Sequence, residues 1–94
     1  YENDGAANPT FTAADIATTA DSAHDVEVAD MDGDGDLDII SGSANDHTIA
    51  WYENDGAANP TFTAADIATN IGVVRDIHIA DIDHDGDLDI GAAT

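Results

Sequence analysis

The sequence predicts an all-β protein made of four-stranded antiparallel blades of the β-propeller type. The first observation is a repeat: Tyr1–Thr18 and Tyr52–Thr69 are the same eighteen residues, and the offset is 52 − 1 = 51. The second is that apolar and polar residues alternate with the two-residue spacing of strands, between segments rich in turn residues. A period near 50 residues is typical of propellers, solenoids and arrays.

The first predicted strand of each repeat leads into an acidic loop. Asp25–Ala29 alternates polar and apolar residues, and so does its counterpart Asp76–Ala80. Leu37–Ser43 follows the acidic loop as the second strand, and Thr48–Tyr52 is the third. The polar stretch Ala44–His47 is predicted to turn between these two strands.

The fourth strand is predicted over Thr61–Ile67. It follows a loop at Asn54–Pro60, because Asn-Asp-Gly is a strong turn signal and proline cannot donate to a strand ladder. The equivalent stretch of the first copy includes Ala13–Ala17, where residue propensity also allows a short helix. We favour the strand there, because a helix of this length is unstable alone.

Two 51-residue repeats divide the chain, the first at 1–51 and the second, truncated, at 52–94. A blade needs neighbours to cover its faces, and two blades cannot close a ring. The fold is therefore predicted to be incomplete as a ring, either a piece of a longer array or a protomer that completes its blades with neighbours. The sequence leaves a closed ring and an open stack as alternatives.

The charge of the chain is strongly negative. It has 21 acidic residues and one basic residue, Arg75, for a formal net charge of −20. Such a charge repels nucleic acid and anionic lipid and attracts cations, so we expect no nucleic-acid partner. No apolar run approaches the roughly 20 residues of a membrane span, so membrane insertion is not expected either. Hydrophobic residues make up 43% of the chain, which argues against disorder.

Each repeat contains one aspartate-rich loop of the pattern D-x-D-x-D-G-x-x-D, at 30–38 and at 81–89. Ca²⁺ takes six to eight oxygen ligands, and a tightly turned loop can direct alternate carboxylates inward. Glycine at the sixth position permits the sharp turn. We predict one Ca²⁺ per repeat, two in total, with a backbone carbonyl ligand from Asp36 or Asp87. The predicted metal residues are Asp30, Asp32, Asp34, Asp36, Asp38, Asp81, Asp83, Asp85, Asp87 and Asp89.

A solvated acidic turn is the alternative to a metal site. At separations near 5 Å, neighbouring carboxylates repel by roughly 1 to 3 kcal/mol per pair, so a fold that gathers them needs a cation. The loops are not EF-hands, because strands precede them and position twelve holds Ser41 or Ala92 in place of glutamate. Zinc is not expected without cysteine, and His84 is interpreted as a solvated turn residue.

Neither catalysis nor sugar binding has a strong signal. No nucleophile and base recur together, so we predict that the protein is not an enzyme. The aromatic residues Trp51, Tyr52 and Tyr1 have ring faces that suit glycans. For Trp51 we favour packing between blades, because it alternates with the apolar Ile49.

The segments ADMDGDGDLDIISGS, residues 29–43, and TIAWYEND, residues 48–55, resemble the FG-GAP/VCBS repeats of bacterial surface and secreted proteins, which are related to integrin α-chain propeller blades. The resemblance covers essentially the whole chain. It implies β-propeller blades, structural Ca²⁺ in the D-x-D-x-D-G-x-x-D loops, an extracellular or cell-surface location, and roles in adhesion, carbohydrate contact or scaffolding.

We therefore expect a calcium-stabilised structural repeat module of an extracellular assembly, such as an array or fibre built from repeated units. Its expected partners are other copies of the same repeat, because identical units stacked head to tail present the same interface each time. The alternatives are a lectin-like, glycan-binding propeller and an accessory domain of a secreted polysaccharide-degrading enzyme.

Overall fold

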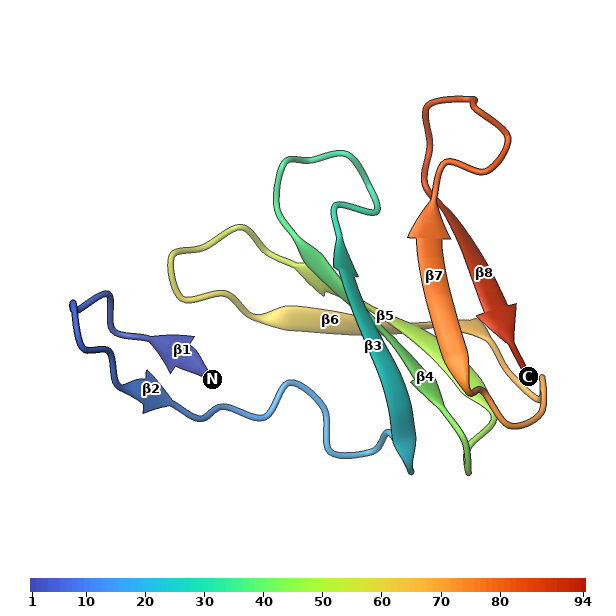
Figure 1. Cartoon of the computed structure of the whole chain (residues 1–94), viewed down its shortest axis with the longest axis horizontal. Coiled ribbons are helices and arrows are strands. Elements are labelled where there is room, and N and C mark those ends of the chain that lie inside the picture. Colours follow the sequence, from blue (N-terminus) through green and yellow to red (C-terminus); the bar gives the residue numbers. More distant parts are fainter.

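The protein is described by a computed structural model covering residues 1–94, and it contains strands and no helix (Figure 1). The strands form three antiparallel sheets: a pair β1–β2, a four-stranded sheet β3–β4–β5–β6 and a pair β7–β8. The predicted all-β class with four-stranded antiparallel blades is confirmed. The bounds are β1 Glu2–Asn3, β2 Phe11–Thr12, β3 Ala23–Ala29, β4 Asp38–Ser43, β5 Thr48–Asn54, β6 Phe62–Ala68, β7 Asp76–Ala80 and β8 Asp89–Ala93.

The four-stranded sheet, hereafter blade 1, joins consecutive strands in a simple up-and-down order. Its register places Val28 opposite Ile39, and Ile39 opposite Tyr52. Successive strands are connected by the acidic loop, by the predicted turn at Ala44–His47 and by the predicted loop after Asn54. The blade runs from residue 23 to 68, so it spans the point where the sequence repeat begins again.

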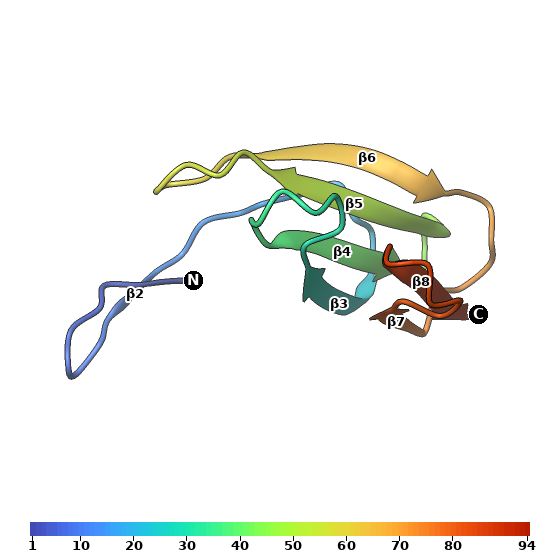
Figure 2. The same ribbon diagram turned by 90° about the horizontal axis from the view of Figure 1, so that it is seen from above.

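The β7–β8 pair, hereafter blade 2, repeats the first two strands of blade 1. Ile77 lies opposite Ala92 as Val26 lies opposite Ser41, with the offset of 51 kept on both strands (77 − 26 and 92 − 41). Blade 2 stacks beside blade 1, as Figure 2 shows from above, with β7 alongside β3 and β4.

The core of the protein lies between the two blades. It is formed by Ile40 and Ile49 from blade 1 and by Val74 and Ile77 from blade 2 or the segment leading into it. Trp51 packs against this cluster, so the predicted position of Trp51 between blades is confirmed. Burying such side chains stabilises the stack by roughly 1.5–3 kcal/mol each.

Two contacts fix how closely the blades approach. Gly42 on β4 has no side chain, and a Cβ placed there would lie 2.5 Å from Cγ1 of Val74. Glycine is therefore required for this spacing. At the edge of the interface the backbone N–H of Ile77 donates to Oδ2 of Asp25 at 2.7 Å, which ties β7 to β3.

The first copy of the eighteen-residue repeat folds differently from the second. In the second copy, Tyr52–Thr69 contributes the end of β5 and all of β6, but in the first copy only the two-residue strands β1 and β2 form. The strand predicted over Ala13–Ala17 is therefore wrong, because no strand equivalent to the first half of β5 lies beside it. Smaller differences are that β4 starts at Asp38 instead of Leu37 and that β5 continues to Asn54.

Candidate metal centre

The first acidic loop leaves β3 at Asp30 and returns to β4 at Asp38. Gly33 and Gly35 have φ values of 75° and 93°, in the left-handed region that costs a residue with a Cβ. The predicted need for glycine at the sixth loop position is therefore met at Gly35. These two reversals coil the chain tightly enough to bring its aspartates around one centre.

Backbone N–H groups hold the first carboxylate of this loop. Gly33 and Asp34 donate to Oδ1 of Asp30 at 2.9 and 3.1 Å, and Gly35 donates to Oδ2 at 2.9 Å. Asp34 also donates to Oδ1 of Asp32 at 3.2 Å. The loop is therefore wound around the Asp30 side chain, which fixes the direction of that carboxylate.

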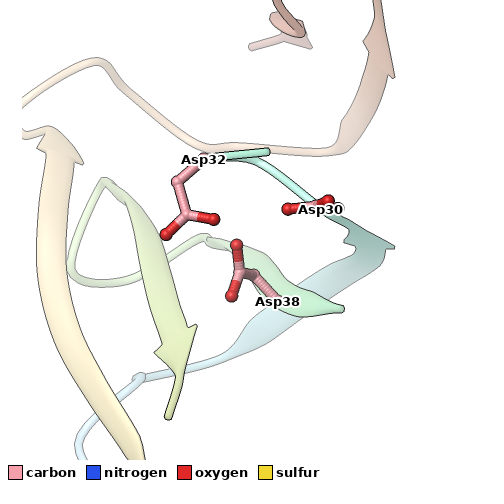
Figure 3. Close-up of side chains that lie close together, drawn as sticks. All are labelled: Asp30, Asp32 and Asp38. Atoms are coloured by element: carbon pink, nitrogen blue, oxygen red, sulfur yellow. The ribbon is translucent and has the colours of Figure 1, made fainter. Parts of the chain in front are cut away.

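Three of the five predicted side chains in this loop point toward one another, as Figure 3 shows for Asp30, Asp32 and Asp38. Each offers one carboxylate oxygen, and these oxygens all lie within 4.8 Å of one another. Two oxygens bound to the same Ca²⁺ at about 2.3–2.6 Å can be at most about 5.2 Å apart. The cluster therefore fits a shared Ca²⁺ with three side-chain ligands.

The other two predicted residues lie outside this cluster. Asp34 accepts a hydrogen bond from the backbone N–H of Asp36 at 2.8 Å through its Oδ1. The carboxylate of Asp36 lies next to Gly56 in the loop after β5, at the place where an added Cβ would be. Their roles as ligands, and that of the Asp36 carbonyl, stay predictions.

Asp38 joins the loop to the sheet. Its side chain is fully buried, and Oδ2 accepts the backbone N–H of Met31 at 3.1 Å. Oδ1 accepts the backbone N–H of Asn54 at 2.9 Å, and the Asn54 side chain donates to the carbonyl of Leu37 at 2.9 Å. An ion held by Asp38 would therefore be linked to three strands, β3, β4 and β5.

The second loop repeats the arrangement of the first. Asp81, Asp83 and Asp89 each place one carboxylate oxygen within 4.8 Å of the others. The loop N–H bonds recur at matching positions: Asp85 and Gly86 donate to Asp81, Asp85 donates to Asp83, Asp87 donates to Asp85 and Ile82 donates to Asp89.

Histidine replaces the first loop glycine in this second copy. His84 has a φ of 63°, close to the 75° of Gly33, and its side chain is exposed. It lies outside the acidic cluster. The structure thus places His84 as an exposed turn residue, in agreement with its interpretation from the sequence.

No basic side chain neutralises either cluster. The only close pair of an acidic and a basic group in the protein joins Asp76 to His78 at 3.1 Å, away from both loops. Partial desolvation raises the pKa of Asp32, and the nearby carboxylates of Asp34 and Asp38 act in the same direction. A divalent cation would relieve this repulsion, because it favours the ionised form of every carboxylate around it.

The two loops differ in two backbone contacts. The N–H of Gly33 donates to Asp30, and His84 makes no equivalent bond to Asp81. Asp89 accepts the N–H of Ile82 at 2.8 Å, as Asp38 accepts that of Met31, but Asp89 has no counterpart of the bond from Asn54. It is accordingly less buried than Asp38. Asn54 was missed as a supporting residue in the sequence analysis, which placed it in a loop. Its recurrence as Asn3 is shared by all eighteen residues of the repeat, so no sequence signal was specific to it.

The aromatic residues do not form a common surface. Tyr52 is 6% exposed and Trp51 packs on the core, whereas Tyr1 is 92% exposed. The structure also contains no helix able to cross a membrane.

Comparison with known families identifies the chain. The sequence profile of the FG-GAP-like repeat matches residues 1–41 and again residues 30–92. Searches of curated proteins and of solved structures gave no match. The two matches together cover nearly the whole chain, so the protein belongs to the FG-GAP-like repeat family, and it is a structural repeat module.

Proposed function

We propose that the protein is a calcium-stabilised, non-enzymatic structural module that works in an extracellular or cell-surface assembly. The observation that carries the proposal is the duplicated cluster: two loops of the same pattern each bring three carboxylates to one point without a basic partner. The ion would supply the missing positive charge and fasten the two strands on either side of each loop. In blade 1 it would also act through Asp38 and Asn54 on the third strand.

The proposed location follows from the same chemistry. Loops with this few ligands from short side chains suit the millimolar calcium outside cells, where weak sites of extracellular modules are filled. Membership of the FG-GAP-like family agrees with a structural role. The glycan-binding alternative gains no support from Trp51 and Tyr52, whose rings are engaged in packing.

Calorimetric titration and thermal unfolding test the proposal. We expect two Ca²⁺ per chain by isothermal titration calorimetry. A ligand at 100 times its dissociation constant adds about 2.7 kcal/mol per site, so chelation should lower the melting temperature by roughly 10 °C or more. Asp32→Ala and Asp83→Ala should each remove one of the two binding events.

The control is Asp15→Ala, which removes the same charge from an exposed residue outside both loops. It should leave both binding events in place. If all three substitutions weakened calcium binding equally, binding would depend only on the net negative charge of the protein. Unchanged melting in chelator would rule out a structural role for the ion.

A further inference from the structure

Met31 occupies a central place in the first acidic loop. Its chain neighbours are Asp30 and Asp32, two of the three aspartates of the cluster. Its backbone N–H donates to Oδ2 of Asp38, the third aspartate, at 3.1 Å. The chain itself and this hydrogen bond therefore tie the position of Met31 to the positions of all three carboxylates.

The side chain of Met31 reaches the core between the blades. It is partly buried and packs against the cluster that includes Val74 and Ile77, which are fully buried and lie outside blade 1. The other apolar residue of the loop, Leu37, is 58% exposed and is not packed against this cluster. Met31 is therefore the side chain through which the first acidic loop takes part in the contact between the blades.

Blade 2 is held against blade 1 along β7. Figure 1 shows β7 alongside β3, the strand that leads into the first acidic loop. The backbone N–H of Ile77 donates across the interface to Asp25 at 2.7 Å, and the Ile77 side chain is fully buried. Because Met31 and Ile77 pack into the same core, moving Met31 outward would expose apolar surface in the contact that holds blade 2.

The charge of the cluster determines whether Met31 stays in place. The three carboxylates offer oxygens that lie within 4.8 Å of one another, and no basic side chain is near them. Without a cation their mutual repulsion favours an expanded loop. Expansion would move the residue that lies between Asp30 and Asp32, and that residue is Met31. A bound ion would hold the carboxylates together and keep the Met31 side chain in the core.

We propose that calcium in the first acidic loop also holds blade 2 against blade 1, and that Met31 is the positioning residue that connects the ion to the contact between the blades. This inference rests on the proposed calcium module and adds a second role to one of its ions. Coupling of this kind is reciprocal: an ion that favours docking of the blades is itself bound more tightly when the blades are docked.

The N–H of Ile77 reports on the contact between the blades, because its acceptor, Asp25, belongs to the other blade. Hydrogen exchange of this amide, followed by NMR, measures how often the blades separate. The amides of the β4–β5 ladder are the reference, since their bonds stay closed when only the blades separate. We expect chelation of calcium to increase the exchange rate of the Ile77 N–H by at least about fivefold, the lower end of typical coupling between two sites.

Met31→Ala tests the connection, because it leaves every carboxylate of the loop in place. The ratio of the Ile77 exchange rates in chelator and in saturating calcium should fall to within about twofold of one, the range expected when a contact is absent. The β4–β5 amides should keep their response to calcium. Leu37→Ala is the matched control, since it removes an exposed apolar side chain from the same loop, and it should keep the full ratio at Ile77.

A pair of ligand variants identifies the loop responsible. Asp32→Ala removes a carboxylate of the first cluster, and Asp83→Ala removes its equivalent in the second. Asp32→Ala should abolish the effect of calcium on the exchange of the Ile77 N–H. Asp83→Ala should leave that effect in place, because the first loop still holds its ion.

Equal effects of Met31→Ala and Leu37→Ala on the Ile77 ratio would overturn the inference, and so would equal effects of the two ligand variants. Circular dichroism shows whether Met31→Ala is folded; should it be unfolded, the comparison of Asp32→Ala with Asp83→Ala decides. Calorimetric titration of the same samples separates the two proposals. Two bound ions without any effect on Ile77 would leave the calcium module intact and remove only the coupling, whereas absence of calcium binding would overturn both.

Discussion

The first and second copies of the eighteen-residue repeat have the same sequence and different structures. Tyr52–Thr69 provides the end of β5 and the seven residues of β6, whereas Tyr1–Thr18 provides two strands of two residues each. The difference lies in the neighbours: Ile49, Ala50 and Trp51 pair with residues of β6, and no strand lies at the equivalent position beside residues 14–17. Residue pattern therefore defines where a strand can form, and the adjacent strand decides whether it does.

The same lesson applies to matched positions in the two blades. Val26 and Ile77 occupy equivalent places, as do Asp25 and Asp76, but only one member of each pair lies in the interface between the blades. Substitutions at equivalent positions should therefore change the free energy of unfolding by unequal amounts. The difference between the two changes measures how much of the stability of a blade comes from its contact with the other blade.

The largest difference is expected between Ile77→Ala and Val26→Ala. Ile77 is fully buried in the core, so Ile77→Ala should lower the free energy of unfolding by about 2–5 kcal/mol. Val26 is exposed, so Val26→Ala should change it by no more than about 0.5 kcal/mol in dilute solution. Chemical denaturation at micromolar concentration measures both values. Similar losses at the two positions would mean that the blades are stable independently of their contact.

A smaller effect is expected from Gly42→Ala. The new Cβ would meet Val74 at 2.5 Å, and such overpacking costs about 1–3 kcal/mol. In a Val74→Ala background the substitution should cost much less, because the Cγ1 atom that the new Cβ would meet is then absent. Gly91→Ala is the control, since its nearest neighbour, the His78 carbonyl oxygen, is 4.0 Å away. Strictly additive losses in the double variant would contradict the assigned contact.

The smallest expected effect is the pH-dependent one at Asp25. The N–H of Ile77 holds the pKa of Asp25 below its usual value of 3.8. The ionised Asp25 therefore contributes its full stabilisation of the folded state above pH 3.8, and this contribution is lost as the pH falls through the lowered pKa. Asp25→Asn should therefore have a lower melting temperature than the wild type near neutral pH, and the difference in melting temperature should become smaller in acid. Thermal melts in chelator between pH 3 and 7 measure this gap.

Asp76→Asn is the matched comparison for that experiment, because Asp76 accepts no backbone N–H from another blade. Its side chain bonds to that of His78 and also contacts Asp25, but it lowers the pKa of Asp25 less than the N–H of Ile77 does. It should change the acid profile less than Asp25→Asn does. Equal profiles for the two variants would place the origin of the effect in general charge repulsion instead of the link between β3 and β7.

Much of blade 1 was predictable because each signal was local. Alternation identified β3 and β5, as it did β7 in blade 2, and the turn chemistry of Asn54–Pro60 separated β5 from β6. The spacing of the aspartates also located both clusters, although it could not distinguish Asp30, Asp32 and Asp38 from the two aspartates that the loop turns elsewhere. That distinction depends on backbone N–H groups, which direct the side chains and leave no mark on the spacing.

The contacts between sequence-distant residues were not predictable. The closeness of Gly42 to Val74 and the bond from Asn54 to Asp38 arise only after the strands have paired and stacked. The failure over Ala13–Ala17 has the same origin, because a strand pattern says nothing about whether its hydrogen-bonding partner is in place.

Both acidic loops project from the same end of the molecule, as Figure 1 shows. A stack that keeps this orientation would carry all its ions along one rim, while the opposite rim, which includes the turn at Ala44–His47, has no acidic loop of this kind and would hold together without calcium. Removing calcium from the medium would then weaken the contacts between blades only along the rim that carries the acidic loops. We expect the blades of such a stack to separate first at that rim, before the stack dissociates.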